Sequence, residues 1–198
     1  MSNFRRPKHL TTRRMQETRP NPPKEQAKAQ RPAREIRWNC PVAAKCGGCQ
    51  LTRLSYAEQL QWKQQRVTEL LDGICEVHPI LGMDDPFHYR NKVHAVLSVD
   101  KAGKPISGVY AMGTHRVVPV RHCLIEDRRA DRIIQTIVAM LPAYKLRIYN
   151  EYTHRGFLRH ILIRTGHVTG QIMVVLVATS LEFPGKKAFV QELIQRHP

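Results

Sequence analysis

Three of the five cysteines lie in one short stretch, residues 39–50, where their spacing favours ligation by thiolates. Cys40, Cys46 and Cys49 follow the pattern C-x5-C-x2-C, with Gly47 and Gly48 between the last two. Glycine lets the backbone turn tightly and adopt positive φ, which three sulfurs need in order to converge on one point. Because the stretch has few large apolar side chains, we expect a bound metal or cluster to hold it in place of a packed core.

Three cysteines rarely complete a structural metal or cluster site, so a fourth ligand is expected elsewhere in the chain. Cys123 is the candidate, because it comes directly after a predicted strand and beside His122. The spacing is not the paired C-x2-C of a zinc ribbon. It favours a [4Fe–4S] cluster, with zinc and a site without metal as alternatives. Cys75 has no ligand type beside it and is predicted to be a small buried apolar residue.

The charge balance points to a polyanionic partner. The 198 residues carry a net charge of +16, and the pI is about 10.2. Such a balance favours RNA first and an anionic membrane surface second. No stretch approaches the ~20 apolar residues of a membrane span, and the N-terminus lacks the apolar core of a signal peptide. We therefore expect a cytoplasmic protein without a membrane partner, whose thiols stay reduced.

The composition divides the chain into two parts. Residues 1–37 carry eleven Lys and Arg, three acidic residues and five prolines. With so little apolar surface to bury, this segment is predicted to be a disordered basic arm. It is either a solvated tail or an arm that touches RNA phosphates. Residues 38–198 are predicted to form one domain.

The periodicity of this domain predicts an α+β fold, a mainly antiparallel sheet with packed helices and the iron–sulfur loop near its N-terminus. The first helix begins at the capping box of Ser55 and Glu58, has an apolar stripe expected to be core, and ends at Gly73. The segment 171–178 is apolar throughout, which suggests a central strand covered on both faces. The other predicted elements are an extended piece over 76–81, strands over 92–100, 106–112, 116–120, 146–152 and 158–165, a turn over 101–104, and helices over 127–142 and 186–196.

Four motifs in the same order resemble the RNA uracil-5-methyltransferases of the RumA type. The first is Cys40-x5-Cys46-Gly47-Gly48-Cys49-Gln50 followed by Tyr56-x2-Gln59-Leu60-x2-Lys63. The second is Tyr89-Arg90-Asn91-Lys92, and the third is Gly108-x6-His115-x-Val117-Val118-x3-His122-Cys123. The fourth is Leu158-Arg159-His160-x3-Arg164-x-Gly166-x2-Thr169-Gly170. The resemblance covers residues 39–198.

This resemblance implies that Cys40, Cys46, Cys49 and Cys123 hold a [4Fe–4S] cluster. It also implies a SAM-dependent methyltransferase acting on a uridine in RNA, with 23S ribosomal RNA as the first substrate and transfer RNA as the alternative. The family's S-adenosylmethionine domain, with its catalytic residues and its cofactor loop, has no match in these 198 residues, and no G-x-G-x-x-G follows a strand. We therefore expect the N-terminal half of such an enzyme, a fragment without methyl transfer of its own. A free-standing metal-binding RNA module is the other interpretation.

The role expected for this half is to bind RNA, with no DNA partner. Lysine and arginine would contact phosphates, and tyrosine and histidine would stack on unpaired bases. A solvated surface or an internal partner is the alternative for each side chain. The ten candidate contacts are Tyr89, Arg90, Lys92, His94, His115, Arg116, Arg121, Arg159, His160 and Arg164.

Overall fold

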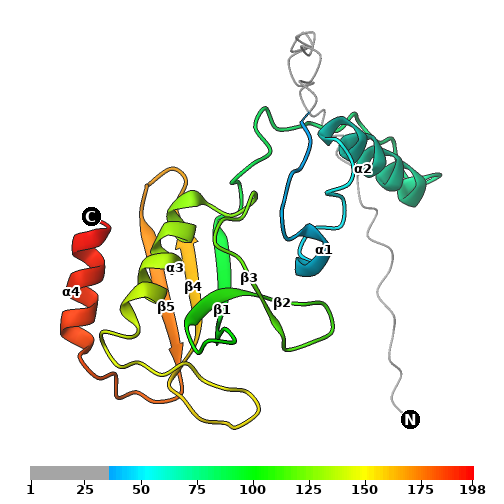
Figure 1. Ribbon diagram of the computed structural model, residues 1–198. Helices are drawn as coiled ribbons and strands as arrows, with labels where there is room; N and C mark the ends of the chain where they lie inside the picture. The colour runs from blue at the N-terminus through cyan, green and yellow to red at the C-terminus, as the bar shows by residue number, and fades with distance from the viewer. Residues whose placement is uncertain (1–35) are drawn as a thin grey trace, which may run out of the picture. The chain divides into compact units, whose positions relative to one another are not determined.

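A five-stranded antiparallel sheet organises the described part of the chain. The structure is a computed structural model that describes residues 36–198 (Figure 1). The strand order is β3-β2-β1-β4-β5, and every neighbouring pair is antiparallel. The strands are β1 (Lys92–Val99), β2 (Pro105–Tyr110), β3 (Val117–Pro119), β4 (Leu158–Thr165) and β5 (Ile172–Ala178). This confirms the predicted α+β class with a mainly antiparallel sheet.

Helices cover one face of this sheet and leave the other face open. The core forms where α3 (Arg128–Met140) and α4 (Lys186–Arg196) pack on the inward side chains of the strands (Figure 1). Val93, Ala95 and Leu97 of β1 belong to this core, so the residues between them lie on the open face. The apolar and polar alternation of β1 therefore assigned its two faces correctly up to Leu97, although Val99 is exposed.

The remaining helices belong to the N-terminal part of the described chain. α1 (Ala43–Cys46) is a single turn inside the cysteine loop, and α2 (Tyr56–Leu71) begins at the predicted capping box. The Ser55 hydroxyl accepts from the Glu58 N–H, and the Glu58 carboxylate accepts from the Ser55 N–H. The turn between β1 and β2 also agrees with its prediction, because the Asp100 carboxylate accepts from the N–H groups of Ala102 and Lys104.

Three expectations about packing are wrong. β5 is an edge strand, and the side chains of Met173, Val175 and Val177 are 37–49% exposed on the open face. The apolar stripe of α2 is core only at its start, where Tyr56 is buried, since Val67 and Leu70 are exposed. The helix packs instead on the segment after it, where Gln64 hydrogen-bonds the backbone of residues 78 and 80.

The third wrong expectation concerns Cys75, which is exposed and not buried. It lies just after Gly73 in the segment that leaves α2, away from the buried core of the sheet and its helices. The segment 146–152 also fails to form a strand. It makes isolated bridges only, because the Asn150 side chain accepts from the N–H groups of residues 152 and 153 and turns the backbone.

The predicted basic arm, residues 1–37, lies outside the described residues except for its last two. Among residues 36–198, no helix has the length and apolar character needed to cross a membrane.

A prediction follows for the start of α3. Asp127 caps this helix by accepting from the Arg129 N–H, and its carboxylate also pairs with the Arg129 guanidinium at 2.8 Å. These contacts, led by the side-chain hydrogen bond, lower the pKa of Asp127 from 3.8 to about 2. Asp127→Ala should therefore lower the free energy of unfolding by about 1 kcal/mol near neutral pH.

The effect of that substitution should depend on pH in a defined direction. A carboxyl group with a depressed pKa stabilises the fold fully above its unfolded pKa, and the stabilisation is lost as pH falls toward the folded pKa. The difference in free energy of unfolding between wild type and Asp127→Ala, measured by chemical denaturation, should therefore shrink as the pH falls from about 5 to about 3. Asp84→Ala, at an exposed carboxylate, is the control. A difference that stays constant over this range would contradict the assignment.

Candidate functional site

The four predicted ligand cysteines line one cavity. Cys40, Cys46 and Cys49 reach it from the loop around α1, and Cys123 reaches it from the segment after β3. The cavity has a volume of about 60 Å3, and its walls are largely apolar side chains such as Val42, Val109, Val120, Leu124 and Ile125. The fold thus places Cys123 and the loop cysteines around one cavity.

The backbone of the loop explains why the first three thiols converge. α1 is closed by hydrogen bonds from the N–H groups of Lys45 and Cys46 to the Val42 carbonyl. Gly47 ends this turn with φ of +67°, a left-handed conformation that a side chain would strain. A Cβ atom at Gly48 would lie 3.2 Å from the Cys46 sulfur. Both glycines therefore allow the close approach that their spacing predicted.

The fourth cysteine is positioned by helix α3. The Cys123 N–H donates to the Asp131 carboxylate at 2.9 Å, and Asp131 is a buried side chain of α3. The backbone at Ile125 and Glu126 lies near the Cys123 thiol and lowers its pKa, against the larger effect of burial.

Burial keeps two of these thiols protonated in the absence of a positive centre. It raises the pKa of Cys123 to about 11 and also raises the pKa of Cys49, where the nearby Arg90 charge opposes the shift. Metal binding requires thiolates and releases these protons. Burial likewise raises the pKa of Glu126 to about 7, with a further contribution from the neighbouring Asp131 carboxylate.

The four thiols and the apolar wall are a donor set of the kind that iron–sulfur clusters use. Within residues 36–198, no group of three or more His, Cys, Asp and Glu side chains lies in a position to hold a metal ion. Trp38, which lines the cavity, has a buried Nε1–H that lacks an acceptor in the described structure.

The ten predicted RNA contacts fall into separate groups. Lys92, His94, His160 and Arg164 share the open face of the sheet, where Lys92 is directly opposite Arg164 in the β1–β4 register. The rings of His94 and His160 meet edge to face at 4.9 Å. Lys92 and Arg164 also line an open hollow of about 780 Å3 at the end of the sheet. This group is suited to a phosphate backbone with unstacked bases.

Arg159 lies beside this group but already has internal partners. It pairs with Glu151 at 2.7 Å, and its guanidinium carbon lies 4.7 Å from the centre of the Tyr149 ring. A β-bulge between Leu158 and His160 gives Arg159 this position. Its charge is therefore partly neutralised, and Arg159 is a weaker candidate for a phosphate contact.

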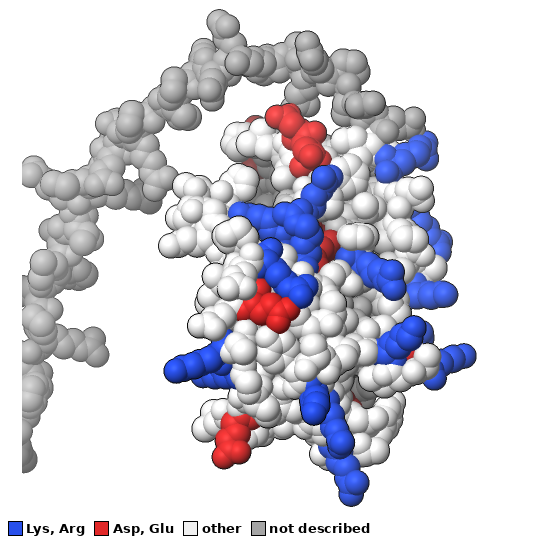
Figure 2. Space-filling view, turned by 60° about the vertical axis from the view of Figure 1, so that its left-hand side comes forward, with Lys and Arg blue, Asp and Glu red and all other residues white. Residues whose placement is uncertain are grey.

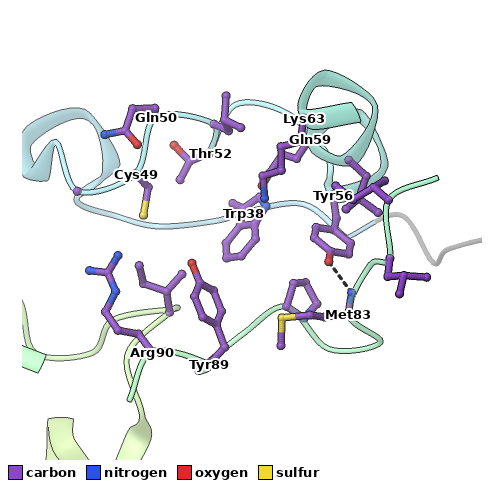
Figure 3. A pocket seen from close by; sticks show the side chains of 17 residues that line it. Trp38, Cys49, Gln50, Thr52, Tyr56, Gln59, Lys63, Met83, Tyr89 and Arg90 are labelled. Carbon is purple, nitrogen blue, oxygen red and sulfur yellow. Dashed lines mark hydrogen bonds between the residues drawn. The ribbon is translucent and has the colours of Figure 1, made fainter. Parts of the chain in front are cut away.

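The other candidates lie outside this open face. His115 and Arg116 lie in the exposed turn between β2 and β3, where the His115 ring packs edge to face on Tyr110 at 5.4 Å. Arg121 is exposed just before Cys123. Tyr89 and Arg90 line a second cavity next to the cysteine loop (Figure 3). Sequence patterns alone could not predict this separation, because it depends on how distant segments meet.

Basic side chains are widely distributed on the surface. Figure 2 shows that Lys and Arg predominate over Asp and Glu on the face in view. The arrangement agrees with the net charge of +16. A polyanion would therefore meet a favourable field over several elements.

Comparison with known proteins identifies relatives that modify RNA. No model of a protein family matches the chain. A protein from Clostridium tetani named an uncharacterized RNA methyltransferase is 40% identical over 167 residues, which are 82% of this chain and 36% of that protein. A Bacillus cereus protein with the same description is 38% identical over 164 residues, 80% of this chain and 36% of its own length.

Solved structures with a similar fold include the Pyrococcus abyssi tRNA (uracil-54, C5)-methyltransferase in complex with S-adenosyl-L-homocysteine. It matches this chain with a TM-score of 0.57 and 25% sequence identity. The match covers 76% of this chain and 35% of the other chain. The chain thus spans only a little over a third of the length of these proteins.

A prediction concerns the histidine pair on the open face. Burial lowers the pKa of His160, and the His94 charge lowers it further. His94→Ala should therefore raise the pKa of His160, because it removes a like charge and admits water. NMR titration of the His160 ring measures this, with His115→Ala as the control, since His115 contacts Tyr110 instead. An unchanged His160 pKa in His94→Ala would show that the two rings do not interact in solution.

Proposed function

We propose, from the premise that this chain belongs to the RNA uracil-5-methyltransferase family, that it is the iron–sulfur and RNA-binding part of a SAM-dependent 23S rRNA uridine C5-methyltransferase. The premise rests on relatives up to 40% identical and on the similar tRNA (uracil-54, C5)-methyltransferase structure. In this proposal the protein acts in the cytoplasm, and the catalytic and cofactor-binding residues belong to the part of the relatives that this chain does not match.

One observation supports the cluster in this proposal: Cys40, Cys46, Cys49 and Cys123 line the same apolar cavity. We assign these four thiolates as ligands of a [4Fe–4S] cluster. Such a cluster supplies metal–thiolate bonds that replace a packed core, and we assign it a structural role. It would join the loop around α1 to the segment that follows β3. Asp131 holds that segment through its hydrogen bond to the Cys123 N–H.

The RNA-binding role is assigned to the open face of the sheet and the basic residues around it. Lys92 and Arg164 would bind phosphates, and the His94 and His160 rings would stack on unpaired bases. His160 should contribute stacking and not charge near neutral pH, because its pKa is lowered. This binding would help offset the few kcal/mol that unstacking a target uridine costs.

The methyl transfer proposed for the complete enzyme is covalent catalysis. A thiolate adds to C6 of uracil, C5 then takes the methyl group of S-adenosylmethionine, and a base removes the C5 proton as the thiolate leaves. None of these groups is assigned to residues 1–198. We therefore expect no methyl transfer by this chain alone, and turnover by it would contradict this division of roles.

Transfer RNA is the second candidate substrate, favoured by the name of the structurally similar archaeal enzyme. Methylation assays on ribosomal and transfer RNA with the complete enzyme would distinguish the two substrates. A free-standing metal-binding RNA module is the other candidate, favoured by the convergence of all four ligands and the basic face within these residues. It predicts cluster and RNA binding without any associated methyltransferase domain.

The ligand assignment predicts opposite outcomes for two cysteines. Cys123→Ser should lose most of the bound iron, because it removes one of four thiolates and the anchor at the far side of the cavity. Cys75→Ser should keep the full iron content, since Cys75 is exposed and does not line the cavity. Iron analysis and the visible absorption of protein purified without oxygen measure both. The reverse pattern would overturn the assignment, and a folded, colourless, metal-free wild type would overturn the cluster itself.

The RNA assignment predicts a specific salt dependence. Each lost phosphate contact lowers the slope of log affinity against log salt by about 0.7 for a single strand. Lys92→Ala and Arg164→Ala should each reduce the slope by roughly this amount. Lys187→Ala, at an exposed lysine of α4, is the charge-matched control and should leave the slope unchanged. If Lys92→Ala, Arg164→Ala and Lys187→Ala all kept the wild-type slope, the open face would be excluded as the phosphate-binding surface.

A further inference from the structure

A second cavity lies beside the cysteine loop and is not explained by cluster binding. It has a volume of about 420 Å3, a size typical of sites for small organic groups. Its walls come from the cysteine loop, from the first turns of α2 and from the segment 80–90 that leads into β1 (Figure 3). Its lining includes Trp38, Tyr56, Gln59, Lys63, Tyr89 and Arg90.

Aromatic rings form the walls of this cavity and are held in place by their neighbours. The Trp38 ring contacts Phe87 at a centroid distance of 4.8 Å. The Tyr56 hydroxyl accepts from the Met83 N–H at 2.7 Å, which joins α2 to the opposite wall (Figure 3). Tyr89 is 51% exposed and extends into the gap from below. Exposed aromatic faces in a preformed gap suit a flat ring.

Positive charge lies next to these rings. Lys63 and Arg90 both line the cavity, and neither forms an ion pair with a carboxylate within residues 36–198. Arg90 acts on Cys49 and Glu126 electrostatically. Two cations beside an aromatic slot suit a ligand that combines a flat ring with an anionic group.

A buried polar group adds a point of recognition. Gln59 is 6% exposed, and its amide nitrogen donates to the Leu54 carbonyl at 3.2 Å. That bond leaves the amide oxygen as an acceptor, and it meets no donor in the described structure. An acceptor at the wall of an aromatic slot can read the edge of a base.

We propose that this cavity, the base pocket, binds one unstacked nucleotide of the RNA. The base lies against Tyr89 and Trp38, and the phosphate lies near Lys63 and Arg90. The proposal rests on the RNA-binding function proposed above and names a second subsite for it, away from the open face of the sheet. The base held here is an additional one, because no group in this cavity is assigned to methyl transfer.

The base pocket shares walls with the cysteine cavity. Trp38, Cys49 and Arg90 line both. The position of these side chains therefore depends on whether the cysteine loop is fixed. Loss of the group bound by the cysteine loop should therefore weaken RNA binding at the base pocket. RNA binding at Lys92 and Arg164 should stay unchanged.

The test uses the intact protein, prepared without oxygen, and a single-stranded RNA of mixed sequence that carries photoreactive 4-thiouridine. Tyr89→Ala should lower the affinity about tenfold, because one stacked base is lost. Tyr89→Phe should bind within about twofold of wild type, since its ring still stacks. Tyr152→Ala is the matched control, because it removes an 80% exposed tyrosine outside the pocket and should leave the affinity unchanged.

Two further measurements make the outcome decisive. Mass spectrometry of the crosslinked protein should place the thiouridine on residues of the base pocket. Lys63→Ala, an exposed position that should not affect folding, should lower both the affinity and the salt slope. Thermal unfolding of each variant confirms that it is folded.

The failures of the two proposals are distinguishable. If RNA binds and depends on Lys92 and Arg164, but Tyr89→Ala and Lys63→Ala bind as wild type and crosslinks lie elsewhere, the base pocket is overturned and the RNA-binding function stands. If the intact protein binds no RNA even at low salt, both proposals fall.

Discussion

The hydrogen bond from the Cys123 N–H to the buried Asp131 carboxylate is the contact on which the candidate site depends. It fixes the end of the segment after β3 to α3, the helix that covers the sheet. Without a fixed Cys123, the cysteine loop would face no defined partner, because α1 is a single turn with no buried residue of its own. A loop of this kind gains little from apolar burial, and the proposed cluster would supply the bonds that order it.

The same constraint accounts for what the sequence could predict. Local rules worked where the cause is local: the capping box at Ser55, the turn at Asp100 and the alternation of β1 each depend on residues a few positions apart. The convergence of Cys123 with the loop was predicted from ligand chemistry, which requires a fourth donor. The cluster itself stays a prediction, because the four cysteines line one cavity but no three of them form a group that could hold a metal ion in the described structure.

The errors arose where tertiary packing decides. An apolar run such as 172–177 does not reveal whether a strand is central or at an edge, and here one face of β5 stays open. The stripe of α2 lacks a sheet to cover it, so Val67 and Leu70 remain exposed. The sequence predicted Tyr89 and Arg90 as RNA contacts but not the cavity that they line, because Trp38, Tyr56 and Tyr89 come from three segments that meet only in the fold.

The two proposed RNA subsites differ in how they are held, and this has a consequence for binding. The open face lies on β1 and β4, which pair along their length and pack on α3. The base pocket instead lies between loop segments, and only a few contacts such as Tyr56 to Met83 join its walls. Strand pairing holds the open face in place, whereas the shape of the preformed pocket depends on the few contacts that join its loop segments. If a cluster fixes the cysteine loop as proposed, it would therefore also lower the entropic cost of binding at the pocket, and a structural cluster would then affect RNA affinity.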